Sequence, residues 1–186
     1  AIGQGSGLAA AIASARAASA RPDDLLSFKR AVVQSLSAEA SVLLVDAEYG
    51  PGLLADFAPD CAKLLAYEAD VYLISEGDRI TRLPENLEIP DYAGLGVRRL
   101  KFFMYYAPRG SAELNARKHD LVARIGADCA LHGLEFLFEP IVYDESDPQG
   151  GTLDFARMKP DLVRAATEVF ADARFGVDIL KVELPV

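Results

Sequence analysis

Residues 134–142 have the sequence LEFLFEPIV, an apolar stretch that carries a carboxylate, Glu139, near its centre. A run of this length and apolarity predicts a β-strand buried on both faces, as in a parallel sheet covered by helices. A charged residue inside such a strand is costly unless it faces a polar centre that it shares with other groups. The position of Glu139 therefore indicates both a buried parallel strand and a polar site on it.

Four other apolar runs of similar character predict further buried strands. They have the sequences SVLLV at 41–45, KLLA at 63–66, RLKFFMYY at 99–106 and VDILKV at 177–182. Ala1 and Ile2 fit the tail of one more strand, so we expect about six in total. Continuous apolarity of this kind favours a parallel sheet over an alternating antiparallel one.

Helical patterns fill the gaps between these strands. The segment 22–36 starts with Pro-Asp-Asp, which marks a helix start, and has apolar residues at helical spacing. The longest predicted helix runs from about Ser111 to His132 with Gly133 as its cap, and a third helix follows Pro160. The alanine-rich stretch 8–20 is typical of a helical surface segment or a mobile loop. Alternating strands and helices indicate an α/β fold with right-handed crossovers.

Polar residues in or directly after the predicted strands decide between two α/β folds. Five strands carry one, namely Asp46, Glu68, Lys101, Glu139 and Lys181. In a (β/α)8 barrel the carboxyl ends of the strands converge on one centre, whereas in an open doubly wound sheet only those at the switch point do so. The pattern therefore favours an α/β fold of the (β/α)8 TIM-barrel type.

The number of strands is smaller than a full barrel requires. Such a barrel has eight strands and usually about 250 residues, whereas this chain has 186 residues and about six predicted strands. The sequence also stops at Val186, directly after a predicted strand. We therefore expect one (β/α)-barrel domain over residues 1–186, incomplete and truncated at its C-terminus, with the last two βα units missing.

The composition argues against several classes of function. Nineteen basic and 28 acidic residues give a net charge of −9, which disfavours nucleic acid and anionic membrane surfaces as partners. No apolar run approaches the ~20 residues that span a bilayer. Cys61 and Cys129 lie far apart in the sequence and are predicted to be reduced core thiols, so we expect a cytoplasmic protein.

Neither a metal nor a cofactor is expected. The two histidines, His119 and His132, and the two cysteines are not clustered, which argues against a zinc site. Both histidines belong to the long helix and are predicted to lie at the surface. The stretch GSGLAA at 5–10 matches the glycine spacing of a dinucleotide-binding motif. The predicted strand before it is too short for such a nucleotide site.

Lys181 is the residue best suited to carry chemistry. An ammonium in a buried strand loses hydration, which favours the neutral amine, a usable nucleophile. A second cation nearby helps, and Lys101 is the natural candidate. Glu139, placed between two lysines, suits a general acid or base. The alternative is a structural ion pair among these residues without a catalytic role.

Asp46 and Glu48 form a second group of polar candidates, in the sequence VDAEYG at 45–50. Their carboxylates suit hydrogen bonds to sugar hydroxyls. They suit equally well a turn or a helix cap, and the sequence leaves both interpretations open.

Six segments match one known family in that family's order. They are LLVDAEYG (43–50), LLAYE (64–68), RLKFFMYYAP (99–108), FLFEPIVYD (136–144), FARMKP (155–160) and FGVDILKVELPV (175–186). The chain thereby resembles the class I tagatose-bisphosphate aldolases, which include the sulfofructose-phosphate aldolases. DILKVELPV and LLVDAEYG together are the most specific part, and the resemblance extends from about Lys29 onward.

The resemblance implies a (β/α)8 barrel in which Lys181 forms a Schiff base with dihydroxyacetone phosphate. It also implies that Glu139 transfers protons while a carbon–carbon bond breaks, and that Lys101 assists at the same site. The protonated imine is the electron sink for the developing carbanion, so this chemistry needs neither a metal nor a cofactor.

Four residues are candidates for substrate binding: Gln4, Asp46, Glu48 and Tyr105. The family's first strand usually ends in an Asp-Gln-Arg-like motif, of which Gly3-Gln4-Gly5 retains only the glutamine. Tyr105 lies in the segment RLKFFMYYAP. The expected partner is a small phosphorylated sugar, and the exposed apolar edges of an incomplete barrel predict a homo-oligomer.

The expected reaction is cleavage of a ketohexose phosphate, such as tagatose 1,6-bisphosphate, into dihydroxyacetone phosphate and an aldehyde such as glyceraldehyde 3-phosphate. Three alternatives stay open. The first is a sulfofructose-phosphate aldolase that yields sulfolactaldehyde, and the second is another Schiff-base lyase. The third is a non-catalytic, incomplete barrel fragment.

Overall fold

The computed structural model describes residues 1–69, 77–147 and 150–184, which belong to two compact units. One unit comprises Ala1–Ser75 and Arg82–Leu100, and the other comprises Glu76–Thr81 and Lys101–Val186. They are called the N-terminal unit and the C-terminal unit below.

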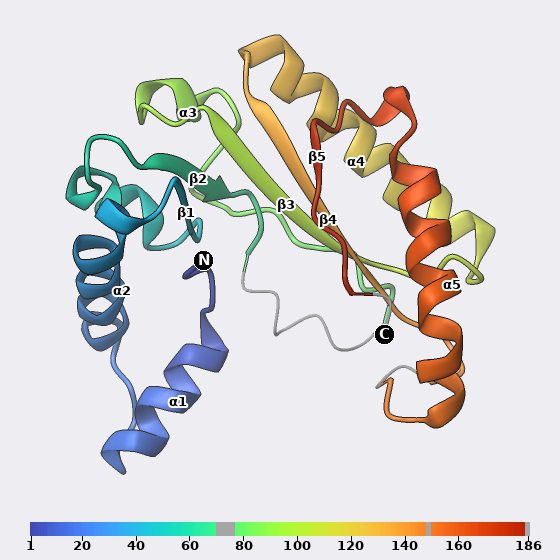
Figure 1. Cartoon of the computed structure of the whole chain (residues 1–186), viewed down its shortest axis with the longest axis horizontal. Coiled ribbons are helices and arrows are strands. Elements are labelled where there is room, and N and C mark those ends of the chain that lie inside the picture. Colours follow the sequence, from blue (N-terminus) through green and yellow to red (C-terminus); the bar gives the residue numbers. More distant parts are fainter. Residues whose placement is uncertain (70–76, 148–149, 185–186) are drawn as a thin grey trace. The chain divides into compact units, whose positions relative to one another are not determined.

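The described residues contain five strands, and each lies within or closely matches a run predicted from the sequence (Figure 1). The strands are β1 (Val42–Val45), β2 (Ala62–Ala66), β3 (Arg99–Tyr106), β4 (Glu135–Val142) and β5 (Ile179–Leu180). Their order in the sheet is β1-β2-β3-β4-β5, and β1 pairs in parallel with β2, as β4 does with β5. The predicted α/β class is therefore confirmed.

The N-terminal unit begins with an extended residue followed by two helices. Ile2 forms an isolated parallel bridge with Val45, as expected for the tail of a strand. Helix α1 (Ser6–Arg16) has no buried residue, so the alanine-rich stretch is a helical surface segment. Helix α2 (Pro22–Leu36) has the predicted bounds and buries Leu25 and Val33.

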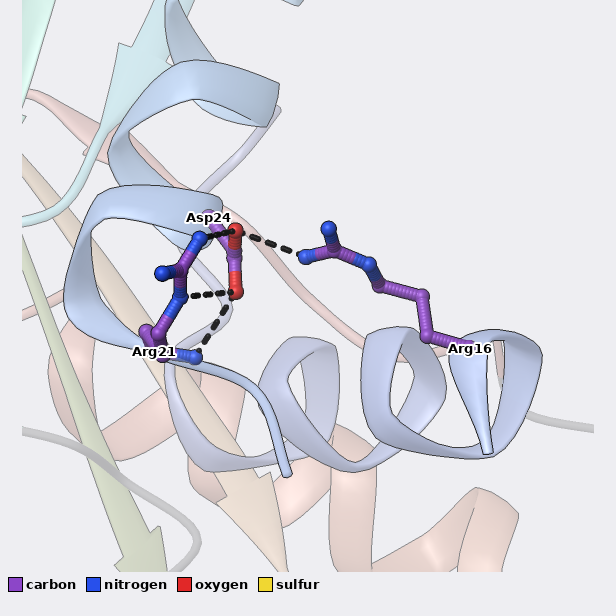
Figure 2. A network of polar contacts seen from close by, with 3 residues as sticks. All are labelled: Arg16, Arg21 and Asp24. Atoms are coloured by element: carbon purple, nitrogen blue, oxygen red, sulfur yellow. Dashed lines mark hydrogen bonds and ion pairs between the residues drawn. The ribbon is translucent and has the colours of Figure 1, made fainter. Parts of the chain in front are cut away.

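A carboxylate at the start of α2 links the two helices (Figure 2). Asp24 accepts hydrogen bonds from the side chain and the amide of Arg21, and its Oδ1 lies 2.6 Å from Nη1 of Arg16. These contacts, with the Arg21 side chain contributing most, hold the pKa of the Asp24 carboxyl well below its usual range. The network fixes the last residue of α1 against the first turn of α2.

A short helix, α3 (Asp91–Gly94), is the third described α-helix of the N-terminal unit, which also has 3-10 helices at Ser37–Glu39 and Gly50–Asp56. Its Tyr92 is fully buried and donates a hydrogen bond to the carbonyl of Ala66 in β2, over 3.1 Å. Cys61 is buried in the same unit, and Cys129 is buried in the other. Both are free thiols, as predicted, and burial raises the pKa of Cys129 to about 12.

Two helices of the C-terminal unit pack on β4 (Figure 1). Helix α4 (Ala112–His132) begins one residue after the predicted Ser111, which is its N-cap and whose hydroxyl accepts from the amide of Leu114. Gly133 ends the helix with a φ of 65°. Helix α5 (Leu153–Phe170) begins earlier than predicted. The Thr152 hydroxyl caps its first turn by accepting from the amide of Phe155.

The helix start predicted after Pro160 is therefore wrong, because Pro160 lies inside α5. A proline here removes one hydrogen bond, to the carbonyl of Ala156. Both residues are exposed, so water can hydrate that carbonyl. The apolar side of α5 and its threonine cap outweigh the lost bond.

Strand β4 is not buried on both faces, contrary to the sequence prediction. Phe136, Phe138 and Val142 are buried, whereas the alternate residues, including Glu139, are half-buried. The Phe138 ring lies 4.7 Å from that of Phe170 in α5, so the buried face is the one that the helices cover. Glu139 lies on the opposite face, since successive strand residues alternate.

Strand β5 has only two residues, whereas the run 177–182 was predicted as a strand. In the register given by the pair Phe138↔Leu180, the next bond of a parallel ladder would need an N–H at residue 140. That residue is Pro140, which has none. The ladder therefore ends after the bond from the amide of Lys181 to the carbonyl of Phe138.

The prediction of a surface position for His119 is also wrong. His119 is half-buried among aromatic rings of the C-terminal unit, with its Nε2 3.1 Å from the hydroxyl of Tyr106. Its ring lies 5.6 Å from that of Phe170 and 5.5 Å from that of Phe175. Burial, and secondarily the charge of Arg174, lower the pKa of His119 from its usual value.

This lowered pKa predicts a pH-dependent stability. The unfolded chain binds a proton at His119 below about pH 6.5, whereas the folded protein resists protonation until a lower pH. The contribution of His119 to stability is therefore complete above about pH 6.5 and is lost as the pH falls through the folded value. We expect the urea midpoint to fall less between pH 7.5 and pH 5.5 in His119→Gln than in the wild type. Equal falls would contradict the burial effect.

A close approach between α4 and the turn Ala173–Phe175 predicts a sensitive glycine. A Cβ on Gly126 would lie 1.9 Å from the carbonyl oxygen of Phe175, a backbone atom. Gly126→Ala therefore forces a shift of that turn, and we expect it to destabilise the protein by about 1–3 kcal/mol in urea unfolding. Gly94→Ala is the control, since nothing lies within 4 Å of a Cβ there. A Gly126 variant as stable as the control would contradict the contact.

Candidate active site

Three charged residues of the C-terminal unit lie in contact. Nζ of Lys101, in β3, is 3.2 Å from Oε2 of Glu139, in β4. Nζ of Lys181, directly after β5, is 2.6 Å from Oε1 of the same carboxylate. Each carboxylate oxygen therefore faces one ammonium, and the three residues predicted as catalytic form one cluster.

The strands place these side chains through their alternation. Lys101, Phe103 and Tyr105 share one face of β3, and Nζ of Lys101 lies 5.1 Å from the centre of the Phe103 ring. The other face of β3 carries Tyr106, whose ring contacts α5 at Phe170. The cluster therefore lies on the face of β3 and β4 that turns away from α5.

The exposure of the two lysines differs strongly. The side chain of Lys181 is 53% exposed, so the prediction that it lies in a buried strand is wrong, whereas those of Glu139 and Lys101 are 15% and 8% exposed. Lys181 is thus the amine that an incoming molecule can reach, and Lys101 is a charge held below it. The two lysines bring positive charge to this place, and positive charge favours an anionic molecule.

The arrangement can support nucleophilic and proton-transfer chemistry. An accessible amine is a potential nucleophile toward a carbonyl group. A carboxylate within hydrogen-bond distance of that amine can move protons to and from the reacting atoms. Lys101 orients this carboxylate from its other oxygen.

Tyr105, predicted to bind substrate, lies further along the same face of β3. Its ring packs edge-on against Phe103, with 5.0 Å between centres, and against Tyr143, with 6.4 Å. The guanidinium carbon of Arg79 lies 5.3 Å from its centre. Tyr105 is half-buried, and its role in binding stays a prediction.

The other three predicted binding residues belong to the N-terminal unit. Asp46 contacts the ammonium of Lys29, and its Oδ1 accepts from the amides of Glu48 and Tyr49 over 3.0 and 2.8 Å. Asp46 therefore has the turn role that the sequence left open. Glu48 and Gln4 are exposed. Substrate binding by these residues stays a prediction.

Several charged residues with long-range contacts were not predicted. Lys29 is fully buried beside Asp46, and Lys118 is fully buried with its Nζ donating to the carbonyl of Tyr105 over 2.9 Å. Burial lowers the pKa of Lys118 to about 8. Helical spacing could have predicted their burial. Lys29 lies four residues from Leu25, and Lys118 lies three residues from Leu121, so each lysine shares the buried face of its helix.

Glu183 and Lys159 are two more residues that sequence reasoning missed. Oε1 of Glu183 lies 2.9 Å from Nζ of Lys159 in α5, and Oε2 accepts from the amide of Val142 over 2.7 Å. Neither spacing nor composition reveals a contact between a side chain and a backbone amide 41 positions away.

The described residues contain no group of three or more His, Cys, Asp or Glu side chains arranged to hold a metal ion. Among the helices in this part of the chain, none has the length and apolarity that crossing a bilayer requires.

Comparison with known proteins identifies related sequences. The model of the DeoC/LacD family of aldolases matches residues 8–186. Tagatose 1,6-diphosphate aldolases of Staphylococcus aureus, strains bovine RF122 / ET3-1 and JH9, are each 34% identical to this chain over 155 residues. The match covers 83% of this chain and 48% of either relative. The chain therefore spans about half the length of these curated relatives.

A solved structure of a Schiff-base-forming fructose-1,6-bisphosphate aldolase has a similar fold. The TM-score is 0.55 with 17% sequence identity, over 88% of this chain and 55% of the other. This similarity confirms the predicted fold class, an α/β fold of the aldolase barrel type. The family match over nearly the whole sequence, with relatives at 34% identity, confirms the resemblance found in the sequence. The chain belongs to the DeoC/LacD family of aldolases.

Proposed function

We propose that this protein is a class I aldolase, a lyase that forms a Schiff base at Lys181 and cleaves a ketohexose phosphate. The observation that carries the proposal is the pairing of an exposed lysine amine with a carboxylate 2.6 Å away. Tagatose 1,6-bisphosphate is the proposed substrate, because the curated relatives are tagatose 1,6-diphosphate aldolases. The products are then dihydroxyacetone phosphate and glyceraldehyde 3-phosphate.

The proposed reaction begins at the substrate ketone. The neutral amine of Lys181 adds to the carbonyl carbon, and loss of water gives a protonated imine. The hydroxyl beyond the scissile bond loses its proton, and the bonding electrons move into the imine as the aldehyde leaves. Protonation of the resulting enamine carbon and hydrolysis release dihydroxyacetone phosphate and restore the amine.

Glu139 is placed to serve these proton transfers. It contacts the reacting nitrogen in the unliganded protein, so it can take a proton from the amine and return one to the leaving water. Lys101 contacts the other carboxylate oxygen and keeps the group oriented. Its positive charge also favours a phosphorylated substrate, and such a charged sugar is consistent with the predicted cytoplasmic location.

Reductive trapping tests this proposal. The protein is treated with borohydride in the presence of dihydroxyacetone phosphate and then mapped by peptide mass spectrometry. An adduct on Lys181 supports the proposal, and an adduct on Lys101 would exchange the roles of the two lysines. A protein that gains no adduct would contradict it. Cleavage assays with tagatose 1,6-bisphosphate and sulfofructose phosphate then distinguish the two predicted substrates.

A further inference from the structure

The segment that carries Lys181 has little strand pairing of its own. β5 pairs with β4 only through Leu137↔Ile179 and Phe138↔Leu180, and Pro140 ends the ladder. Val182 and Leu184, which follow, are exposed. The amide of Lys181 donates to the carbonyl of Phe138, and beyond this bond side-chain contacts attach the described part of the segment to β4.

Two carboxylates accept hydrogen bonds from amides of β4. In a longer β5, backbone carbonyl groups would accept these bonds instead. Oδ2 of Asp178 accepts from the amide of Phe136, and Oε2 of Glu183 accepts from the amide of Val142, each over 2.7 Å. These amides lie three residues before and three residues after Glu139. The segment 178–183 is thus attached to β4 on both sides of the reacting pair.

Glu183 has the greater influence on Lys181, because it lies only two residues beyond it. The chain has no further paired strand residue between them. Val142 is buried, so its amide depends on Glu183 as an acceptor. The second oxygen of Glu183 contacts Lys159, which anchors the carboxylate to α5.

We propose that Glu183 is a positioning residue for Lys181. By accepting the hydrogen bond of the Val142 amide, it holds the backbone after Lys181 so that the amine stays at Glu139. This inference deepens the proposed function and rests on it. The position of Lys181 then depends on the acceptor oxygen and the length of the Glu183 side chain, and not on the ion pair between Glu183 and Lys159.

Two substitutions of Glu183 separate side-chain length from charge. Glu183→Gln keeps the length and an acceptor oxygen but loses the charge, whereas Glu183→Asp keeps the charge but is one methylene shorter. We expect Glu183→Gln to form the Lys181 adduct at a maximal rate within about 3-fold of the wild type. We expect Glu183→Asp to be slower by about 10- to 100-fold, the scale of a 1 Å misplacement. The half-saturating concentration of dihydroxyacetone phosphate stays nearly constant.

Lys159→Ala is the matched control, because it removes the ion pair and leaves the bond to Val142. We expect its trapping rate to stay within about 3-fold of the wild type. A slow Glu183→Gln with a normal Glu183→Asp would overturn the proposal, and so would a Lys159→Ala as slow as Glu183→Asp. Thermal unfolding of each variant measures the fraction of folded protein at the assay temperature. Each trapping rate is divided by this fraction, so that a loss of stability is not counted as a loss of positioning.

A second measurement does not depend on catalysis. Acetic anhydride labels free amines, and mass spectrometry quantifies the label on Lys181 in the absence of substrate. We expect several-fold faster labelling in Glu183→Asp than in Glu183→Gln, since only the former releases Lys181 from Glu139. Equal labelling overturns the positioning role. Absence of any adduct in the wild type would instead contradict the aldolase function, so the two failures are distinguishable.

Discussion

Replacing Lys181 by arginine abolishes the trapping of dihydroxyacetone phosphate by borohydride. A guanidinium keeps the positive charge beside Glu139 but offers no amine that can form an imine. We expect the adduct yield to fall by at least about 1,000-fold, the loss expected when a covalent nucleophile is removed. Peptide mass mapping after reduction measures this yield.

The same variant is expected to fold normally. The side chain of Lys181 is 53% exposed, and an ion pair this exposed contributes at most about 1 kcal/mol. The urea midpoint of Lys181→Arg should therefore match that of the wild type. The control is Lys101→Arg, which leaves the amine of Lys181 in place and should retain an adduct on it. Trapping at the wild-type yield in Lys181→Arg would refute the assignment of the nucleophile.

The charged cluster could be predicted from sequence because strand geometry is regular. A lysine or glutamate inside an apolar strand is costly without a shared polar environment, and neighbouring parallel strands bring such residues together. Lys101 and Glu139 each interrupt an apolar run, and Lys181 follows closely on another. Strand geometry therefore predicts that these three residues lie together, but it does not predict which of them is the nucleophile or the proton-transfer group.

Contacts between a side chain and a distant backbone group follow no such rule. Glu183 accepts from the amide of Val142 at a place where β4 is no longer paired with β5. Asp46 forms a turn and pairs with Lys29, although its sequence suits sugar binding equally well. These contacts depend on the three-dimensional register, which a single sequence does not reveal.

Two helical features were mispredicted for a related reason. Pro160 is a strong local signal for a helix start, but the cap at Thr152 and the buried face of α5 outweigh it. His119 lies in a charged stretch of sequence, yet the rings of Phe170 and Phe175 come from other elements and cover it. Tertiary packing overrides local propensity in both cases.

The cleavage step should depend on Glu139 more than on any residue except Lys181. Glu139→Gln keeps the size of the side chain, but its single amide oxygen replaces only one of the two acceptor oxygens that face the lysines. An amide also does not carry protons at neutral pH. We expect the rate of ketose cleavage to fall by about 100- to 10,000-fold, the usual contribution of a general acid or base. A coupled assay for the released aldehyde measures this rate.

The same substitution should lower the stability, because two ammonium groups now face a neutral partner. Lys101 is only 8% exposed, so it loses a charge-assisted hydrogen bond in a poorly hydrated place. We expect a loss of about 1.5–3 kcal/mol in urea unfolding. Glu135→Gln is the matched control, since it removes a carboxylate on the same face of β4 and should leave the cleavage rate near that of the wild type. If Glu139→Gln cleaves the substrate as fast as this control, Glu139 does not transfer the protons, and its contact with Lys181 is a structural ion pair.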